Sequence, residues 1–168
     1  MVLTGSAALG IWTTPRQSRD IDLCASVPAE AVPKLLARFD GIAAGPSDDP
    51  GALRLNFAGW DIDVFVVGDD PYYDDCARRA VHIDTPFGPI AVATAEDLLI
   101  HKLIKLRTDR RRFLQDLADM RALLETGGQR LQWEHLQRWL PPAEADFLRR
   151  LRDLSDEEIA QGKLPRLG

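Results

Sequence analysis

Apolar residues in the first half of the chain occur in short runs bounded by turn residues, which is typical of strands. Val2 and Leu3 form a very short first run, and either that strand is short or the natural protein carries residues upstream. Further strands are predicted at residues 20–26, 53–57 and 60–67, the last two joined by a two-residue turn, Ala58-Gly59. Residues 81–93, interrupted by Pro86-Phe87-Gly88, predict one more strand pair.

Helices are predicted where apolar residues recur every three or four positions. In the first half these are residues 6–12, with Ser6 placed as the cap, residues 28–39 and residues 71–80. Residues 41–51 are rich in Gly, Pro, Ser and Asp and predict a loop. In the second half, helices are expected from Thr94 to about Leu106, and over residues 113–125, 133–140 and 143–154. The last dozen residues are polar, and we expect them to fray.

This order predicts an α/β (α+β) fold, a mixed β-sheet flanked by helices with an all-helical C-terminal half. Residues 1–94 form the predicted core, and residues 95–168 a helical region that packs on it as one structural unit. The sequence has 45% apolar and 28% charged residues, as soluble globular proteins do. A net charge of -5 argues against a protein that coats nucleic acid, but it does not exclude a local basic groove.

No membrane-spanning run, secretion signal or metal-binding cysteine pattern is evident. No apolar run approaches the roughly 20 residues that span a bilayer. Cys24 and Cys76 lie far apart without a C-x-x-C pairing, which fits small buried side chains in a reducing cytoplasm better than a zinc site or a disulfide.

The most informative stretch pairs a Gly-Ser turn with two nearby acids. In a strand, the side chains of Asp20 and Asp22 point to the same face, and the rise of a strand puts their β-carbons about 7 Å apart. Two carboxylates on one face suit a hard divalent cation. Gly5-Ser6 at the start of a helix offers backbone N–H groups and a hydroxyl to a phosphate. A third carboxylate would come from Asp63, or less readily Asp61, if residues 60–67 lie beside residues 20–26.

These residues resemble the signature of the nucleotidyltransferase (DNA polymerase beta-like) superfamily. Gly5-Ser6, a spacer of thirteen, and Asp20-Ile21-Asp22-Leu23 match its Gly-Gly or Gly-Ser turn followed by an acidic strand. The run from Arg16 to Asp22 is similar to the Arg-x-Thr/Ser-x-Asp-x-Asp variant of small bacterial members, including abortive-infection-type toxin nucleotidyltransferases. The segments Ile62–Phe65, Val92–Leu103 and Asp116–Asp119 resemble later motifs of the same families.

The resemblance implies a set of site residues. Asp20, Asp22 and Asp63 would be the catalytic metal ligands for two Mg²⁺ ions, with Gly5 and Ser6 at the triphosphate. Lys102 would face the active site from the helical half, although by pattern alone it is a surface lysine. Arg16 and Arg19 flank the acidic strand and would either clamp phosphate or pair with nearby acids.

The function expected on these grounds is metal-dependent nucleotidyl transfer in the cytoplasm. An NMP would move from an NTP to an RNA 3′ end, such as that of tRNA, or to a protein hydroxyl. A toxin with a partner antitoxin protein is one setting. The alternatives are a non-catalytic nucleotide-binding or regulatory module of the same fold, and a structural reading in which the acids lie on a solvated face.

Two features of the helical half bear on this expectation. The basic run Arg110-Arg111-Arg112 is either an RNA contact or a solvated face. Asp116 and Asp119 lie one turn apart, with Arg112 four residues before Asp116. That spacing suits an intrahelical ion pair, or a tie between this helix and the lysine at position 102.

Overall fold

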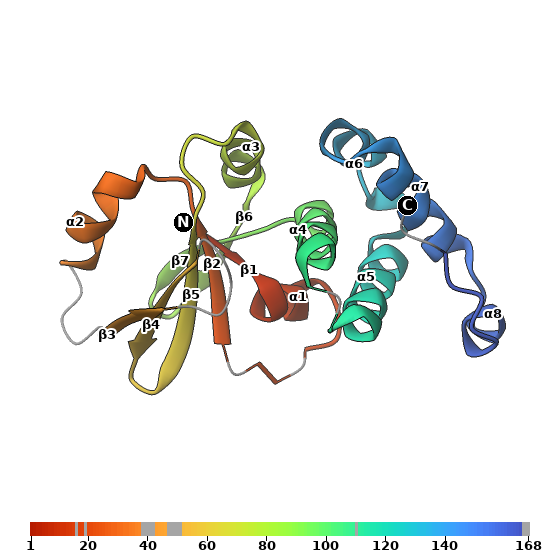
Figure 1. Cartoon of the computed structure of the whole chain (residues 1–168), viewed down its shortest axis with the longest axis horizontal. Coiled ribbons are helices and arrows are strands. Elements are labelled where there is room, and N and C mark those ends of the chain that lie inside the picture. Colours follow the sequence, from red (N-terminus) through yellow and green to blue (C-terminus); the bar gives the residue numbers. More distant parts are fainter. Residues whose placement is uncertain (16, 19, 38–42, 47–51, 110, 166–168) are drawn as a thin grey trace. The chain divides into compact units, whose positions relative to one another are not determined.

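The chain forms two units, Met1–Thr94 and Ala95–Gly168, which are described separately below (Figure 1). The computed structural model describes residues 1–15, 17–18, 20–37, 43–46, 52–109 and 111–165. In this part of the chain no helix has both the length and the apolar character needed to cross a bilayer.

The first unit is built on a mixed sheet of seven strands in the order β3-β4-β5-β2-β1-β7-β6. The strands are β1 (Val2–Thr4), β2 (Asp20–Ala25), β3 (Ala43–Pro46), β4 (Ala52–Phe57), β5 (Trp60–Val66), β6 (Val81–Thr85) and β7 (Gly88–Val92). β2 runs parallel to β5 and β1 runs parallel to β7, whereas the other neighbouring pairs are antiparallel. The predicted mixed sheet and fold class are confirmed.

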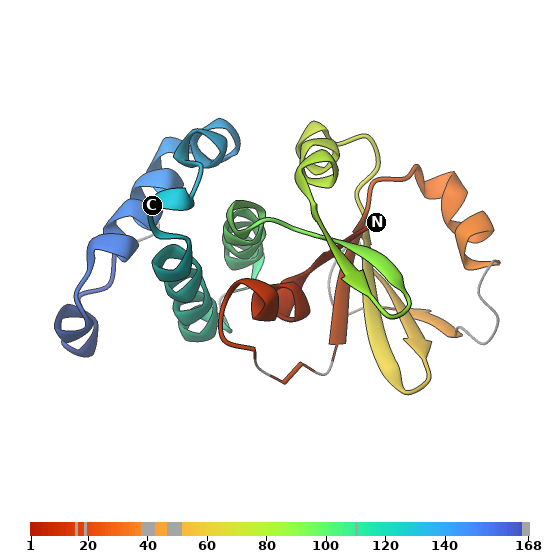
Figure 2. The ribbon, with the colours of Figure 1, turned by 180° about the vertical axis from the view of Figure 1, so that it is seen from behind.

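Helices cover both sides of this sheet. They are α1 (Gly5–Trp12), a 3-10 turn η1 (Ala29–Ala31), α2 (Val32–Leu36) and α3 (Pro71–Arg79). Figures 1 and 2 show α1 on one side of the sheet and α2 on the other. Leu36 of α2 packs against a buried apolar cluster of Ala25, Leu55 and Val64. The acids of β2 and β5 alternate with these residues along the strands and so point to the side of α1.

The β4–β5 hairpin sets the register of the central strands. Ala58 and Gly59 have φ values of 51° and 83°, so both central turn residues are left-handed, as a type I′ hairpin turn requires. The turn pairs Phe57 with Trp60 and, further along, Arg54 with Asp63. The predicted hairpin is therefore confirmed.

Three local predictions are wrong. Residues 43–46, predicted as loop, form the edge strand β3. The sequence Ala-Ala-Gly-Pro does not indicate a strand, and these residues form one because their backbone pairs with β4. Ser6 is not the helix cap, since α1 begins at Gly5 and its N-cap residue is Thr4. The C-terminal residues do not all fray, because Asp156–Ala160 forms α8, with a capping box between Ser155 and Glu158.

The second unit is helical. It contains α4 (Ala95–Thr108), α5 (Phe113–Gly127), a 3-10 turn η2 (Gly128–Arg130), α6 (Trp133–Trp139), α7 (Pro142–Asp153) and α8. Its core is built from side chains with at most 2% exposure, including Leu99, Leu103, Met120, Leu136 and Phe147. That residues 95–168 pack on residues 1–94 as one structural unit stays a prediction.

Two acids at the start of α4 are buried and bind α6. Glu96 accepts a hydrogen bond from the backbone N–H of Gln132 at 2.8 Å, and Gln132 is the N-cap residue of α6. Asp97, which has no exposed surface, lies 2.8 Å from Nε2 of His135. These contacts satisfy polar groups that would be costly to bury alone, and they fix α6 against α4.

Candidate active site

A row of polar side chains crosses four neighbouring strands on the face of the sheet that α1 covers. In register, Thr4 of β1 lies opposite Asp22 of β2, Asp22 opposite Asp63 of β5, and Asp63 opposite Arg54 of β4. Because paired residues of neighbouring strands point to the same face, the row brings two carboxylates from strands roughly 4.8 Å apart onto one surface. Strand β5 lies beside β2, as the prediction of a third carboxylate from Asp63 requires.

Gly5 begins α1 directly against Asp22. Its φ of 63° lies in the left-handed region, and a β-carbon built there would lie 1.8 Å from Oδ2 of Asp22. Only glycine fits both the backbone conformation and the close approach. The first turn of α1, which contains Ser6, therefore starts beside the Asp22 carboxylate.

Of the four acids on β2 and β5 (Asp20, Asp22, Asp61 and Asp63), Asp63 is the most buried, at 2% exposure. Arg54 binds it with two parallel hydrogen bonds, Nε to Oδ1 at 3.0 Å and Nη2 to Oδ2 at 2.9 Å. A buried carboxylate needs such a partner, because an unpaired charge in this position would be strongly destabilising. Arg54 was not among the residues predicted from the sequence. The two-residue turn at residues 58–59 was the available signal, because it fixes the pairing of position 54 with position 63.

Asp20 and Asp61 form a second, more open row beside the first. They are opposite each other in the β2–β5 register, and Asn56 lies opposite Asp61 on β4. Oδ1 of Asp20 accepts a hydrogen bond from the Ser18 hydroxyl at 2.8 Å, and Oδ1 of Asp61 accepts one from Asn56 at 2.9 Å. Asp63 rather than Asp61 is therefore the acid directly beside Asp22.

The donor chemistry of Asp20, Asp22 and Asp63 fits a hard divalent cation, which binds carboxylate oxygens. A carboxylate has about four lone-pair sites, and the two hydrogen bonds from Arg54 use one site on each oxygen of Asp63. Among the described residues, however, no group of three or more His, Cys, Asp or Glu side chains is gathered as a metal site. The assignment of these three acids as metal ligands stays a prediction.

Lys102 of α4 lies in an ion cluster within the helical unit. Its Nζ is 2.8 Å from Oδ1 of Asp116 and 2.6 Å from Oδ2 of Asp119, both on α5. The three side chains have exposures between 4% and 13%. Of the two alternatives for Asp116, the structure has the tie to the lysine, whereas Arg112 donates to Gln115. The contact of Lys102 with a nucleotide stays a prediction.

The remaining basic candidates either lie outside the described residues or are paired with acids. Arg16 and Arg19, which were predicted either to clamp phosphate or to pair with nearby acids, and Arg110 lie outside the described residues. Arg111 is paired with Asp109, with Nε 3.0 Å from Oδ1. Arg107 is held by Glu144 through two 2.7 Å hydrogen bonds, which raise the pKa of its guanidinium.

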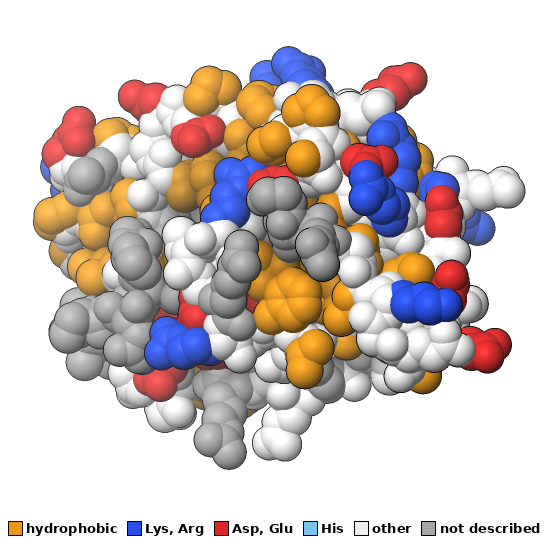
Figure 3. Space-filling model, turned by 45° about the vertical axis from the view of Figure 1, so that its right-hand side comes forward, with side chains coloured by type: hydrophobic (Ala, Val, Ile, Leu, Met, Phe, Trp, Pro, Cys, Tyr) orange, Lys and Arg blue, Asp and Glu red, His pale blue; other side chains and the backbone are white. Residues whose placement is uncertain are grey.

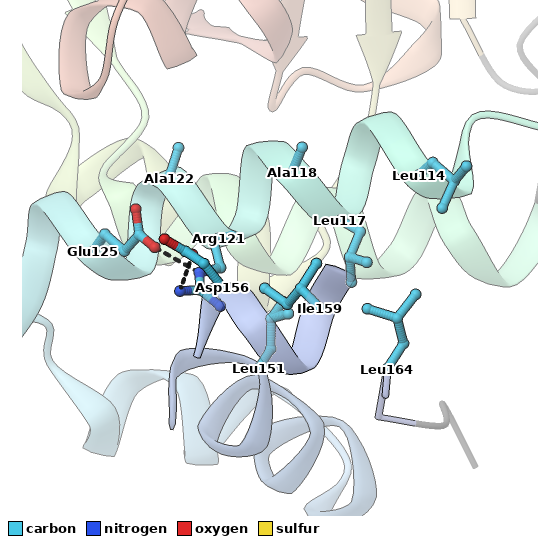
Figure 4. A pocket seen from close by; sticks show the side chains of 10 residues that line it. All are labelled: Leu114, Leu117, Ala118, Arg121, Ala122, Glu125, Leu151, Asp156, Ile159 and Leu164. Carbon is cyan, nitrogen blue, oxygen red and sulfur yellow. Dashed lines mark hydrogen bonds and ion pairs between the residues drawn. The ribbon is translucent and has the colours of Figure 1, made fainter. Parts of the chain in front are cut away.

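A pocket of about 430 Å³ lies between α5, α7 and α8 (Figure 4). Its wall is mostly apolar, with Leu117, Leu151 and Ile159 pointing into it. At one end Arg121 binds Glu125 at 2.5 Å and Asp156 at 3.1 Å. None of the predicted site residues lines this pocket.

Two solved structures resemble this fold at low sequence identity. One is an antigenic nucleotidyltransferase-like protein from Paracoccidioides brasiliensis, with 16% identity and a TM-score of 0.56 over 95% of this chain and 82% of that chain. The other is the Megavirus polyadenylate synthase, with 15% identity and a TM-score of 0.54 over 74% of this chain. The match spans only 28% of the synthase chain. A search of curated proteins finds no match.

A family profile gives the more specific result. The profile of the nucleotidyl transferase AbiEii toxin of type IV toxin–antitoxin systems matches residues 1–162, nearly the whole chain. That span includes the Gly5 turn, the acids of β2 and β5, and the lysine of α4. The predicted relationship to abortive-infection-type nucleotidyltransferases is confirmed, and the chain belongs to the AbiEii family of nucleotidyltransferase toxins.

Proposed function

We propose that this protein transfers an NMP from an NTP to an acceptor hydroxyl, at the 3′ end of an RNA or on a protein, as the toxin of a toxin–antitoxin pair. The observation that carries the proposal is the direct pairing of Asp22 with Asp63, with Gly5 pressed against Asp22. Two carboxylates side by side repel each other unless cations offset them. A built-in arrangement of this kind is better suited to binding cations and phosphate than to stability.

In this proposal each of the predicted site residues has its own role. Gly5 lets the first turn of α1 approach the site, so that its backbone N–H groups and the Ser6 hydroxyl bind the triphosphate. Asp20, Asp22 and Asp63 hold two Mg²⁺ ions, which supply Lewis-acid stabilisation of charge on the phosphate oxygens. Arg54 fixes the orientation of Asp63 through its two hydrogen bonds. Arg16 and Lys102 complete the predicted nucleotide contacts.

The decisive experiment measures label transfer. The protein is incubated with Mg²⁺ and each α-labelled NTP in turn, together with total RNA or total protein. We expect label in one acceptor class, release of pyrophosphate, and loss of both in Asp22→Asn. The matched control is Asp84→Asn, because Asp84 is an exposed strand acid of β6, away from the paired acids.

The same experiment separates the alternatives. Metal-dependent NTP binding by calorimetry without transfer to any acceptor would favour a regulatory nucleotide-binding module. The engagement of Asp63 by Arg54 is the observation that favours this second candidate, because it neutralises one predicted ligand. The absence of metal-dependent NTP binding and of transfer would contradict both candidates and leave the acids as a structural feature, whereas binding and transfer that are unchanged in Asp22→Asn would contradict the role of Asp22.

A further inference from the structure

The overall negative charge of the chain hides a difference between its two units. Residues 1–94 contain seven Lys and Arg and thirteen Asp and Glu, whereas residues 95–168 contain fourteen Lys and Arg and thirteen Asp and Glu. The whole negative excess therefore belongs to the first unit. On the face shown in Figure 3, basic side chains lie in separate groups, several of them next to acids, rather than in one continuous basic area. On this face, a binding surface for an anion would be a local group of basic side chains.

Several arginines of the helical unit are already engaged by carboxylates. Arg107 is bound by Glu144, Arg121 by Glu125 and Asp156, and Arg150 by Asp146. In each of these pairs a carboxylate offsets the charge of the guanidinium, so these residues attract a further anion less strongly than an arginine without a carboxylate partner.

Trp133 carries a different arrangement. The guanidinium carbons of Arg149 and Arg152 lie 5.4 Å and 5.1 Å from its ring centroid, within the range of cation–π contact. Trp133 begins α6, whereas the two arginines are one turn apart on α7 and so share a face of that helix. Within the described part of the chain Arg149 has no carboxylate partner, and Arg152 uses only Nε, to Asp153 at 2.8 Å.

This cluster brings two positive charges to one indole ring, with the exposed carboxylate of Asp153 beside Arg152. Like charges one helical turn apart are unfavourable unless an anion lies near both. Each guanidinium is oriented by the indole, which lowers the conformational entropy lost when it binds a ligand. Its remaining N–H groups form a fork that matches the oxygens of a phosphate, and its plane is also able to stack on a nucleic-acid base.

We propose that Trp133, Arg149 and Arg152 form a binding site for the phosphate backbone of an RNA. The inference rests on the proposed function for one point only, that the bound RNA is the acceptor of the NMP. It then deepens that function by favouring an RNA over a protein acceptor. A backbone with a phosphate at every nucleotide presents an anion to each guanidinium, whereas an isolated protein carboxylate engages one of them.

The test is a titration of the full chain with a fluorescent tRNA-sized RNA at several salt concentrations, without NTP or Mg²⁺. For Arg149→Gln/Arg152→Gln we expect the Kd to rise about tenfold, and the slope of log K against log salt to fall by roughly 1.5, since two phosphate contacts are lost. The matched control is Arg138→Gln. Arg138 lies 5.1 Å from the ring centroid of Trp139, so the control removes an equivalent charge from another tryptophan. We expect it to change the Kd less than twofold.

The outcomes separate this inference from the proposed function. An unchanged Kd in the double variant, or an equal loss in Arg138→Gln, would overturn the site. Transfer of the NMP to protein without RNA binding would overturn the site while the transferase activity stands. Asp22→Asn should bind the RNA as the wild type does. RNA binding that depends on Arg149 and Arg152 without any transfer would support the site and count against the proposed function.

Discussion

The backbone of Gly5 lies directly against the carboxylate of Asp22, so closely that a β-carbon at position 5 would be 1.8 Å from Oδ2 of Asp22. The helix start and the acidic strand therefore depend on each other. The acid has its position because the facing residue lacks a side chain, and the turn keeps its left-handed conformation because glycine permits it.

Gly5→Ala should abolish nucleotidyl transfer and destabilise the fold by more than backbone strain alone. The strain of an alanine at positive φ is about 1 kcal/mol, and displacement of Asp22 adds to it. The matched control is Gly68→Ala, because Gly68 has a φ of 58° but open space where a β-carbon would lie. Chemical denaturation and the label-transfer assay measure both effects. Equal losses of stability in the two variants, with activity retained in Gly5→Ala, would contradict the prediction.

Arg54→Gln should lower the free energy of unfolding by about 3 kcal/mol, because it leaves the buried carboxylate of Asp63 without its cationic partner. Arg54→Lys should recover only part of this, since lysine cannot form the two parallel hydrogen bonds. Asn56→Ala is the control on the same strand, and its exposed hydrogen bond to Asp61 should contribute less than 1 kcal/mol. Urea denaturation measures all three variants, and an Arg54→Gln value as small as the control would disprove the pairing.

Lys102→Met should destabilise the helical unit, because the buried carboxylates of Asp116 and Asp119 would both lose the ammonium group that lies between them. We expect a loss of about 3–5 kcal/mol. The triple replacement with Asp116→Asn and Asp119→Asn should recover a large part of it. Lys163→Met, at an exposed lysine near the C-terminus, is the control. Thermal unfolding checks the series, and a triple variant less stable than Lys102→Met would argue against the ion cluster as the cause.

His101 should make stability depend on pH between about 6.5 and 4. Burial lowers the pKa of His101 to about 4, although nearby Asp97 partly opposes the shift. Between the two values the unfolded chain binds a proton that the folded chain does not, so the free energy of unfolding falls as the pH is lowered. His101→Asn should remove this component, whereas His82→Gln, at an exposed histidine, should not. Identical pH profiles for wild type and His101→Asn would refute the assignment.

Much of the first unit could be predicted from local sequence signals. The hairpin at residues 58–59, the acidic strand of β2 and the Pro71 helix each depend on turn chemistry or apolar alternation that a short window contains. The edge strand β3 could not be found in this way, because Ala43–Pro46 has no apolar alternation and is a strand only through its pairing with β4.

The contacts of the candidate site were harder to predict, because they depend on which strands are neighbours. Asp22 and Asp63 were proposed as partners from chemistry, but their alignment follows from the parallel pairing of β2 and β5. The partner of Asp63 was missed, although Arg54 alternates with Leu53 and Leu55 on a strand whose turn fixes the register. Likewise, Glu96 and Asp97 look like ordinary first-turn acids, and only the position of α6 explains their burial.

The central place of β1 in the sheet has a consequence for how the chain is made. β1 bonds to β2 on one side and to β7 on the other, where Leu3 is paired with Val92. During synthesis, the segment that precedes Gly5 has an open edge until residues 88–92 have left the ribosome. A chain interrupted before that point would expose a strand edge that is prone to pair with other chains. The Gly5 turn, which directly follows β1, would then lack one of the two strands that flank its own strand in the sheet.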